Sequence, residues 1–177
     1  GLVFSLGSFA FALLHGQMVL SILDCLPAAC CRRYGKRSKG KPGLMFEILR
    51  NDEIAPLVHR IVVRAPRIAA ARKPGQFVIV RHEEGDERIP LTIADADASA
   101  GTITLIIQAV GHGTKDIVAT PPGGGILDVA GPLGMPTEIE KFGRVVCVGG
   151  GVGTAVLYPL AKALADAGNE VVTIIGG

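Results

Sequence analysis

The sequence has few of the residues that hold metals or cross-link secreted proteins. Its 177 residues contain four cysteines, none of them in a C-x-x-C pair: Cys25, Cys30, Cys31 and Cys147. We therefore expect no zinc site, no iron–sulfur cluster held by this chain alone and no disulfide framework. Cys147 lies in an apolar run, where a small buried hydrophobe is the expected role. This cysteine usage favours a reducing compartment, and we expect a cytoplasmic protein.

An excess of charge of one sign is also missing. The chain has 18 Lys and Arg residues against 16 Asp and Glu residues, a net charge of +2. Its basic residues are not interleaved with aromatic side chains, so nothing points to nucleic-acid binding. No general base with an orienting partner can be read around the histidines, and we expect surface or turn positions for His59, His82 and His112.

A long apolar stretch opens the chain. Residues 1–31 are almost wholly apolar and are followed by the basic segment "RRYGKRSKGKPG". The run is long enough for a membrane span but lacks the positive segment that begins a signal peptide, and "LPAAC" is only a weak lipoprotein-like site. Because the pattern changes at Gly43, we favour a start at Met45. Residues 1–43 would then be a leader and linker outside the fold, and we expect no membrane attachment.

The next part, residues 45–140, is a series of short β-branched segments separated by Gly, Pro and Asp. Six strands are expected, in "MFEILRNDEIAP", "LVHRIVVRAP", "GQFVIV", "RIPLTIAD", "GTITLIIQAV" and "ILDVAGPLG". We expect a turn near Asn51 and Asp52, a strand end at Pro66 and one short helix from Thr114 to Ala119. Such close strand spacing predicts an antiparallel sandwich or barrel.

The last part, residues 141–177, has the order strand, glycine turn, helix, strand. The apolar run "VVCV" precedes the glycines, and leucines then recur at helical spacing in "TAVLYPLAKAL" before "NEVVTII". This order predicts a βαβ unit, with Pro159 in the first turn of its helix. Glycines at such a turn let an anion approach the N–H groups at the helix start. The spacing differs from G-x-G-x-x-G, so a phosphate site and a tight turn that binds nothing both remain open.

Two stretches favour an anion site in the barrel as well. "RIPLT", residues 88–92, combines a guanidinium, a Pro without an N–H and a hydroxyl, although an ordinary edge strand could read the same way. "GHGTKDI", residues 111–117, again places glycines before a helix start. With "GPLG" and the later glycine turn, in this order, these stretches resemble the ferredoxin reductase superfamily of flavoproteins. The likeness is closest to the electron transfer subunits of dihydroorotate dehydrogenase and of ferredoxin:NADP oxidoreductase, also called sulfide dehydrogenase, and covers residues 45–177.

The resemblance implies an antiparallel, FAD-binding β-barrel of the ferredoxin reductase type, followed by the first βαβ unit of a Rossmann-like NAD(P)-binding domain. It implies that Arg88 pairs with the FAD phosphates and that the flavin ring is lined by Pro90, Leu91 and Thr92. The Thr92 hydroxyl would lie near flavin N5, the one catalytic position. The FAD diphosphate would be received by Gly111, Gly113 and Thr114. The NAD(P)H diphosphate would be received by Gly149, Gly150, Gly151 and Gly153.

The resemblance also implies a function. An FAD-dependent subunit of this kind passes electrons between NAD(P)H and an iron–sulfur partner, which would be ferredoxin or a catalytic subunit such as that of pyrimidine biosynthesis. Family members carry a cysteine cluster for a [2Fe-2S] centre, and its ligands do not occur in this sequence. The alternative hypothesis is a non-catalytic flavin-binding module that docks a catalytic subunit in a hetero-oligomer.

Overall fold

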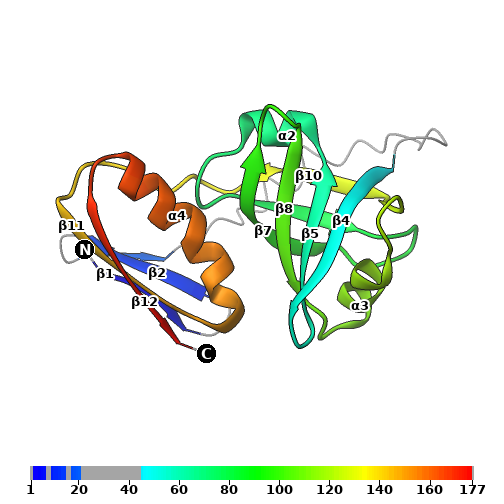
Figure 1. The fold of residues 1–177 in the computed structure, drawn as a ribbon, viewed down its shortest axis with the longest axis horizontal. Helices are drawn as coiled ribbons and strands as arrows, with labels where there is room; N and C mark the ends of the chain where they lie inside the picture. Colours follow the sequence, from blue (N-terminus) through cyan, green and yellow to red (C-terminus); the bar gives the residue numbers. More distant parts are fainter. Residues whose placement is uncertain (1, 7–8, 15–16, 21–44, 177) are drawn as a thin grey trace.

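A computed structural model describes residues 2–6, 9–14, 17–20 and 45–176. The described chain forms two units that lie side by side, a β-barrel and an α/β unit (Figure 1). The first three cysteines of the sequence, Cys25, Cys30 and Cys31, lie outside the described residues.

The barrel is a seven-stranded antiparallel sheet with the strand order β10-β6-β7-β8-β5-β4-β9. Its two outermost strands are joined through a single residue, Leu127, so the sheet curls until its edges nearly meet. Its elements are β4 (Phe46–Ala55), β5 (Val58–Arg64), α2 (Pro66–Ala71), β6 (Phe77–Arg81), β7 (Ile89–Asp97), β8 (Thr102–Gln108), α3 (His112–Ala119), β9 (Gly125–Ile126) and β10 (Asp128–Leu133). The predicted barrel is confirmed, with a seventh strand because "ILDVAGPLG" forms both β9 and β10.

Alternating side chains fill the barrel. Every second residue of β5, β6 and β8 points inward, and the fully buried set includes Ile61, Val63, Val78, Val80, Ile103, Leu105 and Ile107. Full burial of one such side chain contributes about 1.5–3 kcal/mol. Because successive side chains of a strand point to opposite faces, the residues between these core positions lie on the outside of the barrel, where they can build a site.

The first hairpin differs from the prediction. The chain turns at Leu57, which has a φ of 62°, and not near Asn51 and Asp52, which lie inside β4. The Asn51 amide donates to the backbone carbonyls of Val118 and Thr120, both at 2.8 Å. These bonds to the end of α3 hold a turn-forming residue in a strand and tie α3 to the barrel wall.

The helices of the barrel also refine the predictions. Pro66 begins α2 as well as ending the strand before it. A proline is tolerated there because a backbone N–H at the first helical position would have no acceptor within the helix. The predicted helix at residues 114–119 is confirmed, but α3 begins two residues earlier, at His112.

The α/β unit is the predicted βαβ crossover. β11 (Arg144–Gly150) leads through a 3-10 turn (Gly151–Gly153) into α4 (Thr154–Asp166), and β12 (Glu170–Gly176) returns parallel to β11. Leu157 and Leu164 of α4 pack on Val145 and Cys147 of β11. Pro159 lies inside α4 beyond its first turn, which corrects the predicted position. There it removes one N–H of the helical ladder while its side chain is buried.

Asn169 fixes the two ends of this crossover. Its buried amide accepts from the N–H groups of Phe142 at 2.6 Å and Gly143 at 3.0 Å. It donates to the carbonyls of Glu140 and Leu164, both at 2.8 Å. All four hydrogen bonds of the amide are therefore made, and the start of β11 is held against the end of α4.

Three further strands extend the sheet of the α/β unit. They are β1 (Leu2–Leu6), β2 (Phe9–Leu14) and β3 (Gln17–Leu20), and the strand order is β12-β11-β1-β2-β3. β1 runs parallel to β11, with Leu2 opposite Val146. Residues 1–43 are expected to lie outside the fold, and of these the structure describes residues 2–6, 9–14 and 17–20, which pair in this sheet, while residues 21–43 lie outside the described residues. The physical reason is that the edge of β11 presents unpaired N–H and C=O groups, which an extended segment can satisfy.

Across the part of the chain that the structure describes, none of the helices has both the length and the apolar character needed to cross a membrane.

Candidate cofactor site

The outer face of β7 carries the side chains singled out in "RIPLT". Ile89 and Leu91 pack against the barrel core, so the alternating positions on this strand point outward. Arg88, which immediately precedes β7, and then Pro90 and Thr92 form an outward row. Leu91 thus lies on the opposite face of the strand from Pro90 and Thr92, and only its backbone borders the outer surface.

The neighbouring strand β6 completes an apolar wall on this face. Phe77 stands opposite Thr92 and Ile79 opposite Pro90 in the β6–β7 ladder. Both β6 side chains are half-buried on the outside of the barrel, because the buried positions of β6 are Val78 and Val80. Half-buried apolar side chains beside a proline and a hydroxyl form a surface suited to one face of a planar ring system.

One end of this wall is a row of charges across three strands. Arg81, the last residue of β6, stands opposite Asp128 of β10. On the other side of Arg81, Arg88 reaches Asp128 with Nη1 3.2 Å from the carboxylate Oδ2. The Nε atom of Arg81 is buried without a hydrogen-bond partner. Sequence reasoning missed Arg81, although its spacing from Phe77 and Ile79 places it on the same outer face.

The first glycine turn, residues 111–114, adjoins this row and is called the barrel turn below. Gly111 is the N-cap of α3, and its N–H donates to Thr114 Oγ1 at 2.9 Å. A Cβ atom on Gly113 would lie 2.8 Å from Ile89 Cδ1 and 3.1 Å from Glu87 Oε1. Glycine at this position therefore lets the start of α3 approach Ile89 and Glu87 without moving their side chains. The first turn of α3 contains no acidic residue, so its N–H groups are open to an external anion, although the exposed Glu87 carboxylate lies beside them.

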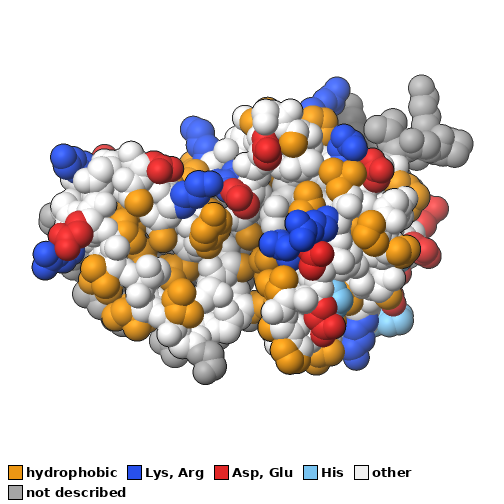
Figure 2. Space-filling view, in the orientation of Figure 1, with side chains coloured by type: hydrophobic (Ala, Val, Ile, Leu, Met, Phe, Trp, Pro, Cys, Tyr) orange, Lys and Arg blue, Asp and Glu red, His pale blue; other side chains and the backbone are white. Residues whose placement is uncertain are grey.

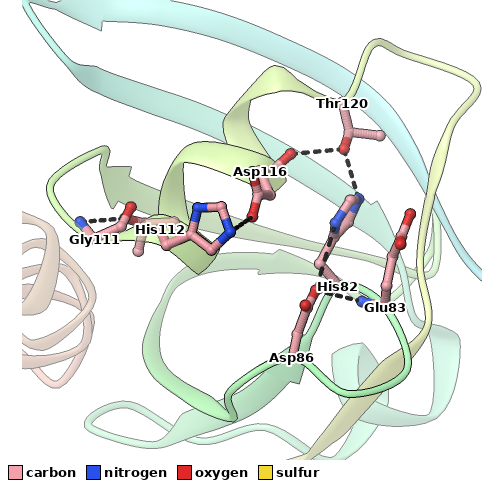
Figure 3. A network of polar contacts seen from close by, with 8 residues as sticks. His82, Glu83, Asp86, Gly111, His112, Asp116 and Thr120 are labelled. Atoms are coloured by element: carbon pink, nitrogen blue, oxygen red, sulfur yellow. Dashed lines mark hydrogen bonds and ion pairs between the residues drawn. The ribbon is translucent and has the colours of Figure 1, made fainter.

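A polar network joins the far end of α3 to the loop that carries Arg88 (Figure 3). The Thr120 hydroxyl donates to the Asp116 carbonyl at 3.0 Å and lies 2.9 Å from His82 Nε2. His82 Nδ1 lies 3.8 Å from the Asp86 carboxylate, and the His82 side chain is 17% exposed. Since the single Thr120 proton is directed to Asp116, His82 Nε2 acts as the donor to Thr120. His82 was expected on the surface or in a turn, and here it braces two walls of the candidate site.

The second glycine turn, residues 149–153, connects β11 to α4 and is called the nucleotide turn below. A Cβ atom on Gly149 would lie 2.9 Å from Leu157 Cδ2, and one on Gly150 would lie 3.2 Å from the Gly176 carbonyl oxygen. Gly151 has a φ of 52° and open space around it, and its carbonyl accepts from the Thr154 hydroxyl at 2.7 Å. Two of these glycines thus permit close packing within the unit, and one faces outward. Gly153 is the buried N-cap of α4.

Cys147 sits in the strand that leads to the nucleotide turn. Its side chain is fully buried, and burial raises the pKa of its thiol. A thiol of this kind stays protonated at neutral pH and is a poor nucleophile. The prediction that Cys147 is a buried hydrophobe is confirmed.

One cavity of the described chain lies elsewhere, between α2, the end of β7 and α4. It measures about 240 Å³, and none of the predicted site residues lines it. Asp95 Oδ1 on its wall lies 3.6 Å from Arg72 Nη2 and 3.8 Å from Lys162 Nζ of α4. Figure 2 shows basic and acidic side chains gathered at the seam between the two units. These contacts hold the units together and are separate from the outer face of β6 and β7.

Comparison with known proteins gives curated relatives that match most of this chain. No family model matches the chain. The chain is 45% identical over 130 residues to a dihydroorotate dehydrogenase B (NAD(+)) electron transfer subunit homolog of Thermotoga maritima, a match that covers 73% of this chain and 46% of the relative. It is 34% identical over 135 residues to the dihydroorotate dehydrogenase B (NAD(+)) electron transfer subunit of Bacillus cereus strain Q1, covering 73% and 52%. The chain thus spans about half the length of the curated relatives it matches.

Solved structures agree with these relatives. A structure of an NADH-dependent reduced ferredoxin-NADP oxidoreductase, studied for flavin-based electron bifurcation, matches with a TM-score of 0.74 and 43% identity over 77% of this chain and 50% of that chain. Phthalate dioxygenase reductase matches with a TM-score of 0.59 and 16% identity over 75% and 42%. The second likeness is one of fold alone. Together they confirm a barrel of the ferredoxin reductase type.

Proposed function

Because the homologues of this chain are electron transfer subunits of dihydroorotate dehydrogenase B and ferredoxin reductase-like FAD- and NAD-binding proteins, we propose that it is an FAD-binding electron-transfer subunit. Its task would be to pass electrons between NAD(P)H and an iron–sulfur partner. The partner would be ferredoxin or the catalytic subunit of a hetero-oligomer. We place this activity in the cytoplasm, as the cysteine usage suggests.

One observation carries the proposal, namely the arrangement on the outside of the barrel. An apolar wall, a row of two guanidinium groups and the open N-terminus of α3 follow one another on β6, β7 and the barrel turn. The groups of FAD follow the same order, because the molecule has a flat ring system at one end and a diphosphate farther along. The crowding around Gly113 supports this fit, since it brings the start of α3 against Ile89 and Glu87, the two residues that flank Arg88 in the chain.

Each residue has a distinct task in this proposal. The Arg88 guanidinium is a planar fork that can donate two parallel hydrogen bonds to a diphosphate, whereas a lysine would offer a point charge. To do so it must turn from Asp128, an exchange that costs little because the Arg88 side chain is 54% exposed. Gly111, Gly113 and Thr114 offer backbone N–H groups and a hydroxyl. Pro90, Thr92 and the Leu91 backbone border the ring, with the Thr92 hydroxyl beside its reactive N5.

The nucleotide turn completes the proposal. The open face of Gly151 and the start of α4 would receive the diphosphate of NAD(P)H, with Gly149, Gly150 and Gly153 shaping the turn. Bound FAD supplies the hydride and single-electron chemistry, so the chain itself needs no acid–base pair.

Reconstitution with FAD tests the proposal. The purified chain should take up one FAD, turn yellow and quench the flavin fluorescence. Arg88→Ala should weaken FAD binding by about 1.5–3 kcal/mol, the usual contribution of a hydrogen bond to a charged group. An Arg88→Ala chain that binds FAD as tightly as the wild type would overturn the assignment of this face. Bound flavin that NADH and NADPH both fail to bleach would favour a flavin-binding module over an electron-transfer subunit.

A further inference from the structure

Arg81 occupies the centre of the charged row, yet it lacks a partner for one of its N–H groups. It closes β6 between Asp128 of β10 and the position of Arg88 on the β7 side. The core-facing neighbour Val80 fixes the orientation of this strand end, so Arg81 shares the outer face with Phe77 and Ile79. The side chain is half-buried, and its Nε atom is fully buried without a hydrogen-bond acceptor.

This arrangement is costly for a structural arginine. A buried N–H without an acceptor loses its hydration and gains nothing in return. The carboxylate that stands opposite Arg81 in the ladder accepts instead from Arg88 at 3.2 Å. Arg72 also has a buried Nε without a partner, but its Nη2 faces the Asp95 carboxylate at 3.6 Å.

The balance of charges in the row also favours the binding of an anion. Asp128 pairs with Arg88, and within the described residues no ion pair joins Arg81 to a carboxylate, so the row carries one uncompensated positive charge. The residues on either side of Arg88, Glu87 and Ile89, meet the start of α3 at Gly113. The first turn of this helix has no acidic residue, and its backbone dipoles favour an anion. The nearby Glu87 carboxylate would repel an anion, but it is exposed and can turn into solvent.

We propose that Arg81 is a second cationic ligand of the FAD diphosphate, because within the described residues its guanidinium is engaged by no carboxylate. The inference rests on the proposed function and deepens it, because it assigns a ligand on β6 in addition to Arg88 before β7. When a phosphate oxygen is present, Arg81 donates to it while Arg88 turns from Asp128 to the same group.

Three variants of Arg81 test the inference by FAD titration of the full chain. Arg81→Met keeps the apolar stem and removes every donor, and we expect the Kd for FAD to rise about tenfold or more. Arg81→Lys keeps the charge but loses the Nε donor, so its Kd should fall between those of Arg81→Met and the wild type. Arg81→Gln keeps donors without charge and should also bind more weakly than the wild type. Arg64→Met is the matched control, because Arg64 pairs with Glu47 at 2.9 Å on another part of the barrel, and its Kd should stay within twofold of the wild type.

Thermal unfolding of the FAD-free proteins separates a ligand from a structural residue. Arg81→Met removes an unsatisfied buried donor, so its unfolding temperature should equal or exceed that of the wild type while its FAD affinity falls. A lowered unfolding temperature with proportionate loss of FAD would make Arg81 structural and overturn the inference. Unchanged FAD affinity in Arg81→Met, with FAD bound by the wild type, would overturn the inference alone. A wild-type chain that binds no FAD would overturn the proposed function as well.

Discussion

The barrel turn and the nucleotide turn both place glycines before a helix, but their surroundings differ. The barrel turn meets residues from other elements, since Gly113 abuts Ile89 and Glu87 and lies near a row that holds two arginines. In the nucleotide turn, the two crowded glycines Gly149 and Gly150 abut residues of their own unit, Leu157 and Gly176. A glycine motif alone therefore reports a close approach of backbone, and the charges brought to it by other strands decide what it binds.

The difference between the two turns is tested most strongly by a substitution that adds a side chain at Gly113. Gly113→Val would force Ile89 and Glu87 away from the start of α3, because its Cβ would lie 2.8 Å and 3.1 Å from their nearest atoms. We expect the Kd for FAD to rise more than tenfold, a loss above about 1.4 kcal/mol. FAD titration measures this, with circular dichroism to confirm that the barrel is folded. An unchanged Kd would show that the approach of α3 to the Arg88 loop does not matter for the flavin.

The comparable glycine substitution in the nucleotide turn should lower the stability of the folded protein and leave FAD binding unchanged. Gly149→Ala places a Cβ 2.9 Å from Leu157 Cδ2, and overpacking of this kind costs about 1–3 kcal/mol. Thermal unfolding should begin at a lower temperature, whereas the Kd for FAD should stay within twofold of the wild type. A large loss of FAD affinity in this variant would mean that the two turns serve one site.

The smallest expected effect belongs to His82, which touches neither turn but braces the barrel turn through Thr120. His82→Ala should raise the Kd for FAD about fivefold, because α3 and the Arg88 loop lose one of their connections. Gln can replace Nε2 as the donor to Thr120, whereas Asn reaches only the position of Nδ1. We therefore expect His82→Gln to restore most of the affinity and His82→Asn to restore little of it. Glu83→Gln is the control in the same loop, and equal behaviour of all four variants would contradict the role of His82.

Much of the candidate site follows from sequence alone. Alternation along "RIPLT" places Arg88, Pro90 and Thr92 on one face of a strand, and the structure has them there. The same rule puts Leu91 on the other face, a consequence that the ring assignment of Leu91 overlooked. Arg81 was missed because a charged residue at the end of a strand looks like ordinary solvent exposure. Its significance depends on Asp128, which lies 47 positions later in the chain and becomes its neighbour only when the barrel closes.

Other features depended on pairings between distant segments. Turn-forming Asn51 lies in a strand because its amide reaches the end of α3, 67 and 69 residues away. The pairing of β1 with β11 joins segments more than 140 residues apart, and local pattern carries no information on such a partner. In contrast, the βαβ unit was predictable because its strands and helix follow one another directly and their periods differ.

The central claim is that the flavin site lies wholly on the barrel. Residues 45–141, expressed without the leader and without the α/β unit, should bind one FAD with a Kd within threefold of that of the full chain. This result would show that neither β1–β3 nor the nucleotide turn contributes to flavin binding. A folded barrel that takes up no FAD, or that binds it more than tenfold more weakly, would contradict the account and place part of the flavin site outside the barrel.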